Sequence, residues 1–178
     1  RVFSTLDSCG AFHHVEVAKE DREKTAFVTP WGLYHFKRLP FGVCNGPPTY
    51  QRLMNTILKN IPSDVVIPYL DDCLVVARSI KDMHRNLRAV LAAHQKAGMK
   101  LKAYKSKLYQ KQTEYLGHLV SEKGISVVPE YVAIVKEWPE PTSIKDIRRF
   151  LGKVSYYRRF IPAYRSEERR VGKECRSR

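Results

Sequence analysis

The chain has 178 residues, of which 43% are hydrophobic and 11% aromatic, and its 32 Lys and Arg against 18 Asp and Glu give a net charge of +14. This composition excludes an intrinsically disordered chain, and no apolar run reaches the roughly 18 residues of a membrane span. The basic excess favours a polyanionic partner, nucleic acid first, although a basic ribosomal or membrane-surface protein would show the same excess.

Residues 165–178 differ in composition from the rest of the chain. They contain one large apolar residue, Val171, and show neither helical nor strand periodicity. We interpret this segment as a non-native tail, because it is similar to the translation of a sequencing-adapter oligonucleotide; a solvated basic tail is the alternative. Without it, 26 Lys and Arg against 15 Asp and Glu leave a net charge of +11, so the basic bias persists.

The N-terminal part is rich in the β-branched and aromatic residues typical of strands. Strands are expected at residues 2–6, 15–18, 25–29 and 33–39. The first strand ends at Asp7, and Pro30-Trp31-Gly32 forms the turn between the last two. A Pro-Pro pair then opens a helix predicted over residues 47–61, which Pro62 ends.

Two apolar runs, residues 65–70 and 73–77, flank Asp71-Asp72 and predict a hairpin with both acids at its turn. A second helix is expected over residues 80–94, with Gly98 closing it. Further strands are expected at 99–103 and 114–121, and helices at 130–138 and 144–160. This order of elements predicts an α+β fold, an antiparallel sheet with helices on one face.

The four cysteines are too far apart for a CxxC motif; they are Cys9, Cys44, Cys73 and Cys175. Their spacing indicates neither a zinc knuckle nor a disulfide framework. We therefore expect buried, free thiols in a reducing compartment.

Three carboxylates follow apolar strands. Asp71 and Asp72 lie between two fully apolar runs, which favours the end of a buried hairpin over a solvated loop, although acids are also common in ordinary turns. Asp7 ends an earlier strand, and if these strands are neighbours the three carboxylates converge at one sheet edge. Such a cluster suits Mg²⁺ or Mn²⁺, and two such ions can assist phosphoryl transfer.

Five motifs occur in the order seen in retroelement reverse transcriptases, and the chain resembles that family. They are Phe3-Ser4-Thr5-Leu6-Asp7, Lys24-Thr25-Ala26-Phe27, Leu39-Pro40-Phe41-Gly42, Tyr69-Leu70-Asp71-Asp72 and Tyr115-Leu116-Gly117-His118. Segments 138–142 and 156–161 narrow the resemblance to gypsy-type long-terminal-repeat retrotransposons. It covers nearly all of residues 1–164 and implies a Pol polyprotein fragment, with a polymerase palm and partial fingers at 1–121 and the start of the thumb or connection at 122–164.

The resemblance also implies roles for individual residues. Asp7, Asp71 and Asp72 would be the catalytic carboxylates and, with the backbone of Ser8, would hold two Mg²⁺ or Mn²⁺ ions. The residues expected to contact the nucleotide are Phe12, Phe41, Gly42 and Lys105. Those expected to contact template or primer are Gln51, Tyr69, Leu116, Gly117, His118, Arg148 and Arg149.

Several of these residues also have a purely structural interpretation when each is taken alone. Phe12 suits a core phenylalanine, and Lys105 belongs to a basic run that suits a solvated strand. Gln51 suits a solvated helix face, and a single histidine such as His118 is more often structural than functional.

The implied activity is RNA-directed DNA polymerisation, with a template, a primer and deoxynucleoside triphosphates as partners and no membrane. The alternatives are a truncated, catalytically inactive nucleic-acid-binding remnant and a purely structural basic domain. Protease, ribonuclease H and integrase are expected elsewhere in the parent polyprotein. The expected location is a cytoplasmic retroelement particle, or the nucleus.

Overall fold

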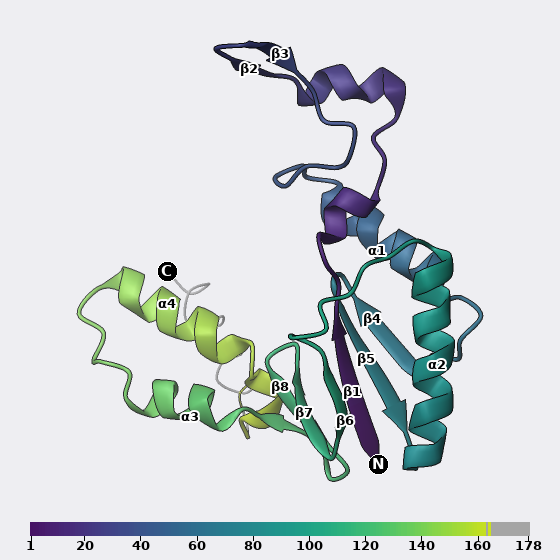
Figure 1. Ribbon diagram of the computed structural model, residues 1–178. Coiled ribbons are helices and arrows are strands. Elements are labelled where there is room, and N and C mark those ends of the chain that lie inside the picture. Colours follow the sequence, from purple (N-terminus) through teal and green to yellow (C-terminus); the bar gives the residue numbers. More distant parts are fainter. Residues whose placement is uncertain (163, 165–178) are drawn as a thin grey trace, which may run out of the picture. The chain divides into compact units, whose positions relative to one another are not determined.

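The computed structural model describes residues 1–162 and 164, and the tail predicted at 165–178 lies outside them together with Cys175. The chain forms two compact units (Figure 1). The first comprises Arg1–Tyr115 and Ser121–Lys123, and the second comprises Leu116–Val120 and the described residues from Gly124 onward. The palm and thumb boundaries expected from the resemblance stay a prediction.

The first unit is built on a four-stranded sheet with the order β4-β5-β1-β6. Its strands are β1 (Val2–Asp7), β4 (Val66–Tyr69), β5 (Asp72–Ala77) and β6 (Lys107–Gln110). β1 pairs antiparallel with β5, from Val2 opposite Ala77 to Asp7 opposite Asp72. This register confirms the first predicted strand and the predicted hairpin, and it sets the geometry of the carboxylates.

Two helices, α1 (Gly46–Ile57) and α2 (Ile80–Lys96), cover one face of this sheet (Figure 1). Met54 of α1 and Met83 of α2 are fully buried against Val75, which lies on the β5 face shared with Cys73 and Ala77. A side chain of this size contributes about 1.5–3 kcal/mol when buried. The predicted α+β architecture with helices on one face is confirmed for this unit.

The ends of both helices follow from their sequences. Pro47 and Pro48 occupy the first turn of α1, where a missing N–H costs no intrahelical hydrogen bond. Ser79 caps α2 by accepting a hydrogen bond from the Asp82 N–H, and Gly98, with a φ of 68°, ends it.

Among the described residues, no helix is long and apolar enough to cross a membrane.

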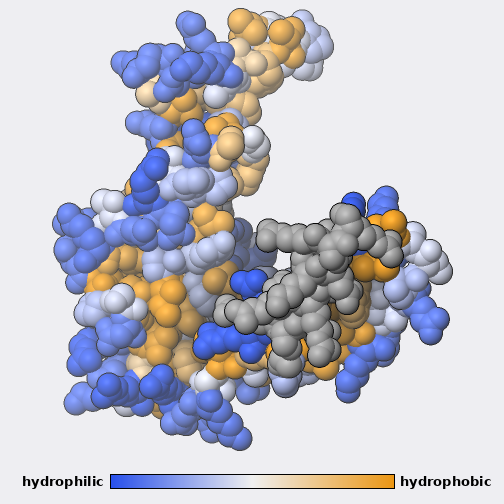
Figure 2. All heavy atoms as spheres, turned by 180° about the vertical axis from the view of Figure 1, so that it is seen from behind, coloured by the Kyte–Doolittle hydropathy of each residue, from blue (hydrophilic) through white to orange (hydrophobic). Residues whose placement is uncertain are grey.

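Between β1 and α1 the predicted strands are shorter than expected, and one is wrong. Residues 15–18 lie between two short 3-10 helices, Ala11–His14 and Lys19–Thr25, and make only a single bridge, Glu16 to Arg38. β2 (Phe27–Thr29) and β3 (Gly32–Tyr34) form the predicted hairpin. The surface view shows hydrophobic side chains gathered on this hairpin (Figure 2).

The C-terminal part differs more from the prediction. The strand expected at 99–103 reduces to one bridge between Ser8 and Leu101, and β6 was not predicted. The strand expected at 114–121 is two strands, β7 (Gln112–Tyr115) and β8 (His118–Ser121), because Leu116 and Gly117 between them have positive φ angles. With β9 (Gly124–Val127) they form a sheet of order β7-β8-β9.

Two C-terminal helices occur where they were predicted, with earlier ends. α3 spans Pro129–Lys136 and α4 spans Ile144–Ser155, followed by a 3-10 turn at Arg158–Phe160. Ser143 caps α4 by accepting a hydrogen bond from the Asp146 N–H.

Candidate active site

The register between β1 and β5 places two carboxylates side by side. Asp7 is the last residue of β1 and lies directly opposite Asp72, the first residue of β5. Their neighbours Leu6 and Cys73 belong to the core beneath the helices. Because side chains alternate along a strand, Asp7 and Asp72 lie on the other face of the sheet, with Cβ atoms expected about 4.5–5.5 Å apart.

A tight turn brings the third carboxylate to the same edge. Tyr69 pairs with Asp72, so the two-residue loop between β4 and β5 is Leu70-Asp71. The sequence predicted both acids at the turn, but Asp72 already belongs to β5. The Ser8 N–H donates a 2.9 Å hydrogen bond to the Asp71 carbonyl, which ties this turn to the end of β1.

The turn is strained and is held by a helix. Leu70 has a φ of 51°, a left-handed conformation that costs a leucine about 1–2 kcal/mol. The Leu70 N–H donates to Gln51 Oε1 at 2.7 Å, and Gln51 Nε2 donates to the Pro68 carbonyl at 3.2 Å. Gln51 of α1 therefore fixes the turn that carries Asp71, a contact that the sequence pattern did not suggest.

The carboxylates interact strongly with one another and with two lysines. Burial, followed by the charges of Asp71 and Asp7, raises the pKa of Asp72, while Lys102 and Lys105 oppose this rise. Lys102 Nζ lies 2.8 Å from Asp7 Oδ1, in an ion pair whose side chains are only 24% and 20% exposed. Contact with Asp7 raises the pKa of Lys102. The site therefore concentrates negative charge, which one lysine directly neutralises.

A pocket of about 110 Å³ opens beside this cluster. Its lining includes Ser8, Phe12, Phe41, Asp71 and Lys102. The Phe12 and Phe41 rings meet edge to face with centroids 5.4 Å apart. The structure thus brings two residues predicted to bind the nucleotide into one cavity with a predicted catalytic carboxylate.

The pocket also contains two buried hydroxyl groups. Ser8 Oγ and the Tyr50 hydroxyl interact with each other; burial raises the pKa of Tyr50, and the contact with Ser8 opposes this rise. Buried polar atoms with few partners are uncommon in proteins, and such groups often meet a ligand or an ordered water. Gly42, with a φ of 89°, lies in the adjoining loop in a conformation that favours glycine.

The donor chemistry of the cluster fits a divalent cation. In the described part of the chain, no three His, Cys, Asp or Glu side chains are arranged as a metal-binding group. The three aspartates nevertheless supply the hard oxygen ligands that Mg²⁺ and Mn²⁺ prefer, and a cation would relieve the repulsion that raises the pKa of Asp72. Asp7 Oδ1 is buried against Lys102 Nζ, which supplies the positive charge that a bound cation would otherwise supply to this carboxylate.

The residues predicted to contact nucleic acid are distributed over both units. In the first unit, Tyr69 is 52% exposed beside the Asp71 turn, whereas the Gln51 amide is engaged with that turn. Lys105 lies near enough for its charge to act on Asp72. In the second unit, Leu116, Gly117 and His118 form a turn, and the exposed Arg148 and Arg149 lie on α4, where Arg149 pairs with Asp146 at 3.6 Å.

The thiols of Cys9, Cys44 and Cys73 differ in their exposure to solvent. Cys73 is buried, and burial, with Asp72 as a second cause, raises its pKa to about 12. Cys9 and Cys44 are free but exposed, so the prediction that the thiols are buried is wrong for these two, which lie just outside packed elements.

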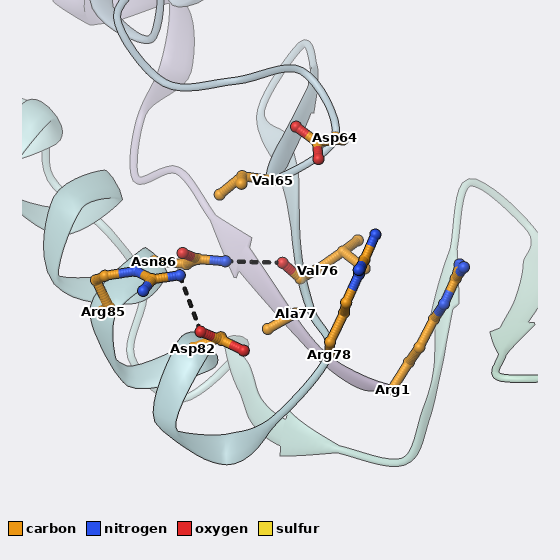
Figure 3. A pocket seen from close by; sticks show the side chains of 9 residues that line it. All are labelled: Arg1, Asp64, Val65, Val76, Ala77, Arg78, Asp82, Arg85 and Asn86. Atoms are coloured by element: carbon orange, nitrogen blue, oxygen red, sulfur yellow. Dashed lines mark hydrogen bonds and ion pairs between the residues drawn. The ribbon is translucent and has the colours of Figure 1, made fainter.

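A larger pocket of about 270 Å³ lies at the opposite end of β5 (Figure 3). Polar groups that line this pocket bind one another: Asn86 Nδ2 donates to the Val76 carbonyl at 3.0 Å, and Arg85 pairs with Asp82 at 2.9 Å. It lacks the convergence of carboxylates found beside Asp7, so the smaller pocket is the better candidate for chemistry.

Comparisons with known proteins show which family the chain resembles. A family model described as "Reverse transcriptase (RNA-dependent DNA polymerase)" matches residues 1–120. The chain is 41% identical over 164 residues to the retrovirus-related Pol polyprotein from transposon opus of Drosophila melanogaster, covering 92% of this chain and 16% of that protein. It is 36% identical over 161 residues to the Pol polyprotein from transposon gypsy of the same species, covering 90% and 16%.

Solved structures show the same fold. The foamy viral protease-reverse transcriptase dRH in complex with double-stranded DNA matches with a TM-score of 0.86 at 24% identity, over 93% of this chain and 29% of that one. The foamy viral protein in complex with an RNA/DNA hybrid matches with a TM-score of 0.79 at 24% identity, over 88% and 21%. The chain spans about one sixth of the Pol polyproteins that it matches. Together with the family match over residues 1–120, these likenesses establish that the chain belongs to the reverse transcriptase family.

Proposed function

We propose that this chain is the polymerase palm, with part of the fingers and the start of the thumb, of a retrotransposon RNA-directed DNA polymerase. The observation that carries the proposal is the placement of Asp7 opposite Asp72, with Asp71 in the adjoining turn and a pocket lined by Phe12 and Phe41 beside them. The foamy viral relatives were solved with an RNA/DNA hybrid and with double-stranded DNA, which supports the same classes of template and primer here.

The reaction is the attack of a primer 3′-hydroxyl on the α-phosphate of a deoxynucleoside triphosphate. A P–O bond forms to the primer, the bond to the β-phosphate breaks, and pyrophosphate leaves. Asp7, Asp71 and the Ser8 carbonyl would hold two Mg²⁺ or Mn²⁺ ions, which would supply charge neutralisation at the attacking and leaving oxygens. Asp72 supports the primer end.

The remaining residues bind and orient. Phe12 packs under the incoming sugar, and Phe41 and Gly42 line the path of the nucleotide. Lys105 attracts the triphosphate, because its charge already acts at this edge of the sheet. Lys102 neutralises the charge of Asp7 in the protein alone.

Contacts to nucleic acid involve both units. Tyr69 lies near the primer end, and Gln51 acts on the template side through the turn that it holds. The backbone of Leu116 and Gly117 and the His118 imidazole hold the primer phosphates. Arg148 and Arg149 bind the duplex backbone without reading its sequence. The protein acts with the rest of its Pol polyprotein in a cytoplasmic retroelement particle, or in the nucleus.

A second candidate function is nucleic-acid binding without turnover. The observation that favours it is the ion pair between Lys102 and Asp7, which engages one of the three carboxylates with a lysine. The basic charge of the chain suffices for binding to a duplex in either case.

Primer extension on an RNA template distinguishes the two functions. We expect Mg²⁺- or Mn²⁺-dependent extension by the chain and a loss of about a hundredfold or more for Asp71→Asn. Asp64→Asn, which changes an exposed acid in the larger pocket, is the control and should retain activity. Equal extension by Asp71→Asn and the parent would refute the polymerase mechanism. Salt-sensitive duplex binding without extension by any form would select the second function.

A further inference from the structure

The turn between β7 and β8 has an unusual backbone. Leu116 and Gly117 have φ angles of 50° and 67°, so both central residues of a two-residue hairpin loop are left-handed. Such loops are usually Asn-Gly or Asp-Gly, because a leucine is unfavourable in this conformation. A leucine persists there only if the surroundings hold it.

Two tyrosine hydroxyls hold this turn. The Tyr156 hydroxyl donates to the Leu116 carbonyl at 2.6 Å, and the Tyr157 hydroxyl donates to the Gly117 carbonyl at 3.0 Å. Each carbonyl of the two turn residues therefore has its own phenolic donor. A Cβ atom at position 117 would lie 3.4 Å from the Tyr157 hydroxyl, so a glycine leaves room for the contact.

The same tyrosines surround His118. Its ring lies 5.3 Å from the Tyr156 ring and 5.6 Å from the Tyr157 ring, measured between centroids. His118 Nδ1 is 3.0 Å from the Leu116 carbonyl. Since a carbonyl oxygen only accepts, Nδ1 carries a proton in this contact, and Nε2 is the ring nitrogen left for a ligand.

We propose that Tyr156 and Tyr157 are positioning residues for primer binding. Their hydroxyls hold the strained Leu116-Gly117 turn, and their rings hold His118, in the shape that receives a primer phosphodiester. This inference rests on the proposed primer contact of residues 116–118. The two hydrogen bonds also connect the sequence motifs 115–118 and 156–161 in one structural unit, although about forty residues separate them.

The proposal is tested by removing the hydroxyls and nothing else. In the full chain, Tyr156→Phe, Tyr157→Phe and the double variant are compared with the parent for affinity to a fluorescent RNA/DNA primer–template, measured by anisotropy. We expect affinity to fall about threefold to tenfold for each single variant and more than tenfold for the double variant, because each removes one hydrogen bond from the turn. Tyr131→Phe is the matched control. The Tyr131 ring packs on Tyr157, but the hydroxyls that donate to the two turn carbonyls belong to Tyr156 and Tyr157.

A spectroscopic measurement separates positioning from simple stabilisation. The ring ¹⁵N shifts of His118 and the amide signals of residues 116–118 should change in the Phe variants and stay unchanged in Tyr131→Phe. If thermal stability falls while these signals and the affinity stay those of the parent, the tyrosines only stabilise the fold and the proposal is wrong.

His118→Ala distinguishes failure of this proposal from failure of the proposed primer contact. If His118→Ala weakens binding but the Phe variants bind like the parent, the primer contact stands and the positioning role is overturned. If neither change weakens binding, the primer contact itself fails, and the positioning role fails with it.

Discussion

At the scale of single residues, Asp72 has a raised pKa, which lowers the stability of the folded protein at neutral pH. It lies half-buried opposite Asp7 and next to Asp71, and burial and these two charges raise its pKa. In the unfolded chain the carboxyl titrates near its ordinary value of 3.8. As the pH rises above that value, the unfolded form gives up its proton first, so the folded protein loses stability relative to the unfolded one.

We therefore expect Asp72→Asn to stabilise the metal-free protein at pH 7. The melting temperature should rise by about 1–3 °C, an amount kept small by partial exposure to solvent. Near pH 3 the carboxyl is neutral in both states, so the difference between variant and parent should vanish. Thermal unfolding in the presence of a chelator measures this, with Asp64→Asn as an exposed control; a destabilised Asp72→Asn at pH 7 would contradict the electrostatic account.

Cys73 leads to a second expectation at the same scale. Burial raises its pKa to about 12, which keeps the thiol protonated and unreactive, whereas Cys9 and Cys44 are exposed. With Cys175→Ser as background, a disulfide reagent at pH 8 should modify two thiols quickly and the third only on unfolding. A third fast thiol would mean that the β5 core opens readily.

Among the elements, those with a clear apolar period were predictable from the sequence. β1, the β4–β5 hairpin, α1 and α2 each place alternate or i, i+3, i+4 apolar residues on one buried face, and all four occur where expected, although α1 ends at Ile57 and not at the predicted residue 61. The strand predicted at 114–121 is interrupted because a leucine adopts a positive φ at position 116, and no local pattern announces that conformation. Residues 15–18 are apolar enough for a strand, but their pairing with residues 37–39 is limited to one bridge and two backbone hydrogen bonds, which is too short to make a strand.

The contact between α1 and the β4–β5 turn predicts the effect of a substitution. Gln51→Leu leaves the Leu70 N–H without its acceptor, and we expect a loss of about 1–3 kcal/mol in the free energy of unfolding. Gln95→Leu, on an exposed position of α2, is the matched control and should stay within about 0.5 kcal/mol of the parent. Urea denaturation measures both, and equal stabilities would show that the turn holds itself.

The candidate site was predictable only in part, for a physical reason. The three aspartates follow apolar strands, so their convergence could be argued from the residues. Lys102 lies in a run of lysines in which no single member stands out, and Gln51 resembles any polar residue on a helix. Contacts across 19 and 95 residues depend on how the elements pack, which spacing along the chain does not encode.

At the scale of the whole molecule, the net charge of +14 determines how the protein should respond to salt. Binding to a duplex releases counterions, so the logarithm of affinity should fall linearly with the logarithm of salt concentration. Arg148 is exposed on α4 without an ion-pair partner among the described residues, whereas Arg149 is paired with Asp146. We expect Arg148→Ala to lower the salt slope by about 1 and Arg149→Ala to lower it less.

Anisotropy titrations at several salt concentrations measure these slopes. An affinity that does not change with salt would exclude backbone contacts as the main source of binding. Equal slopes for the two variants would mean that the pair with Asp146 does not persist on the nucleic acid.

The alternation of side chains along β1 also bears on which mutations the protein can tolerate. Asp7 and Leu6 lie on opposite faces of the sheet, with Leu6 in the core beneath α1 and α2, so a one-residue insertion that shifts the register of β1 exchanges the two. A carboxylate would then enter the core while an apolar side chain replaced it at the sheet edge. Many substitutions on the exposed surfaces of α2 leave that arrangement intact. Scattered substitutions on exposed surfaces should therefore disturb the carboxylate cluster far less than a one-codon insertion or deletion in β1 or β5.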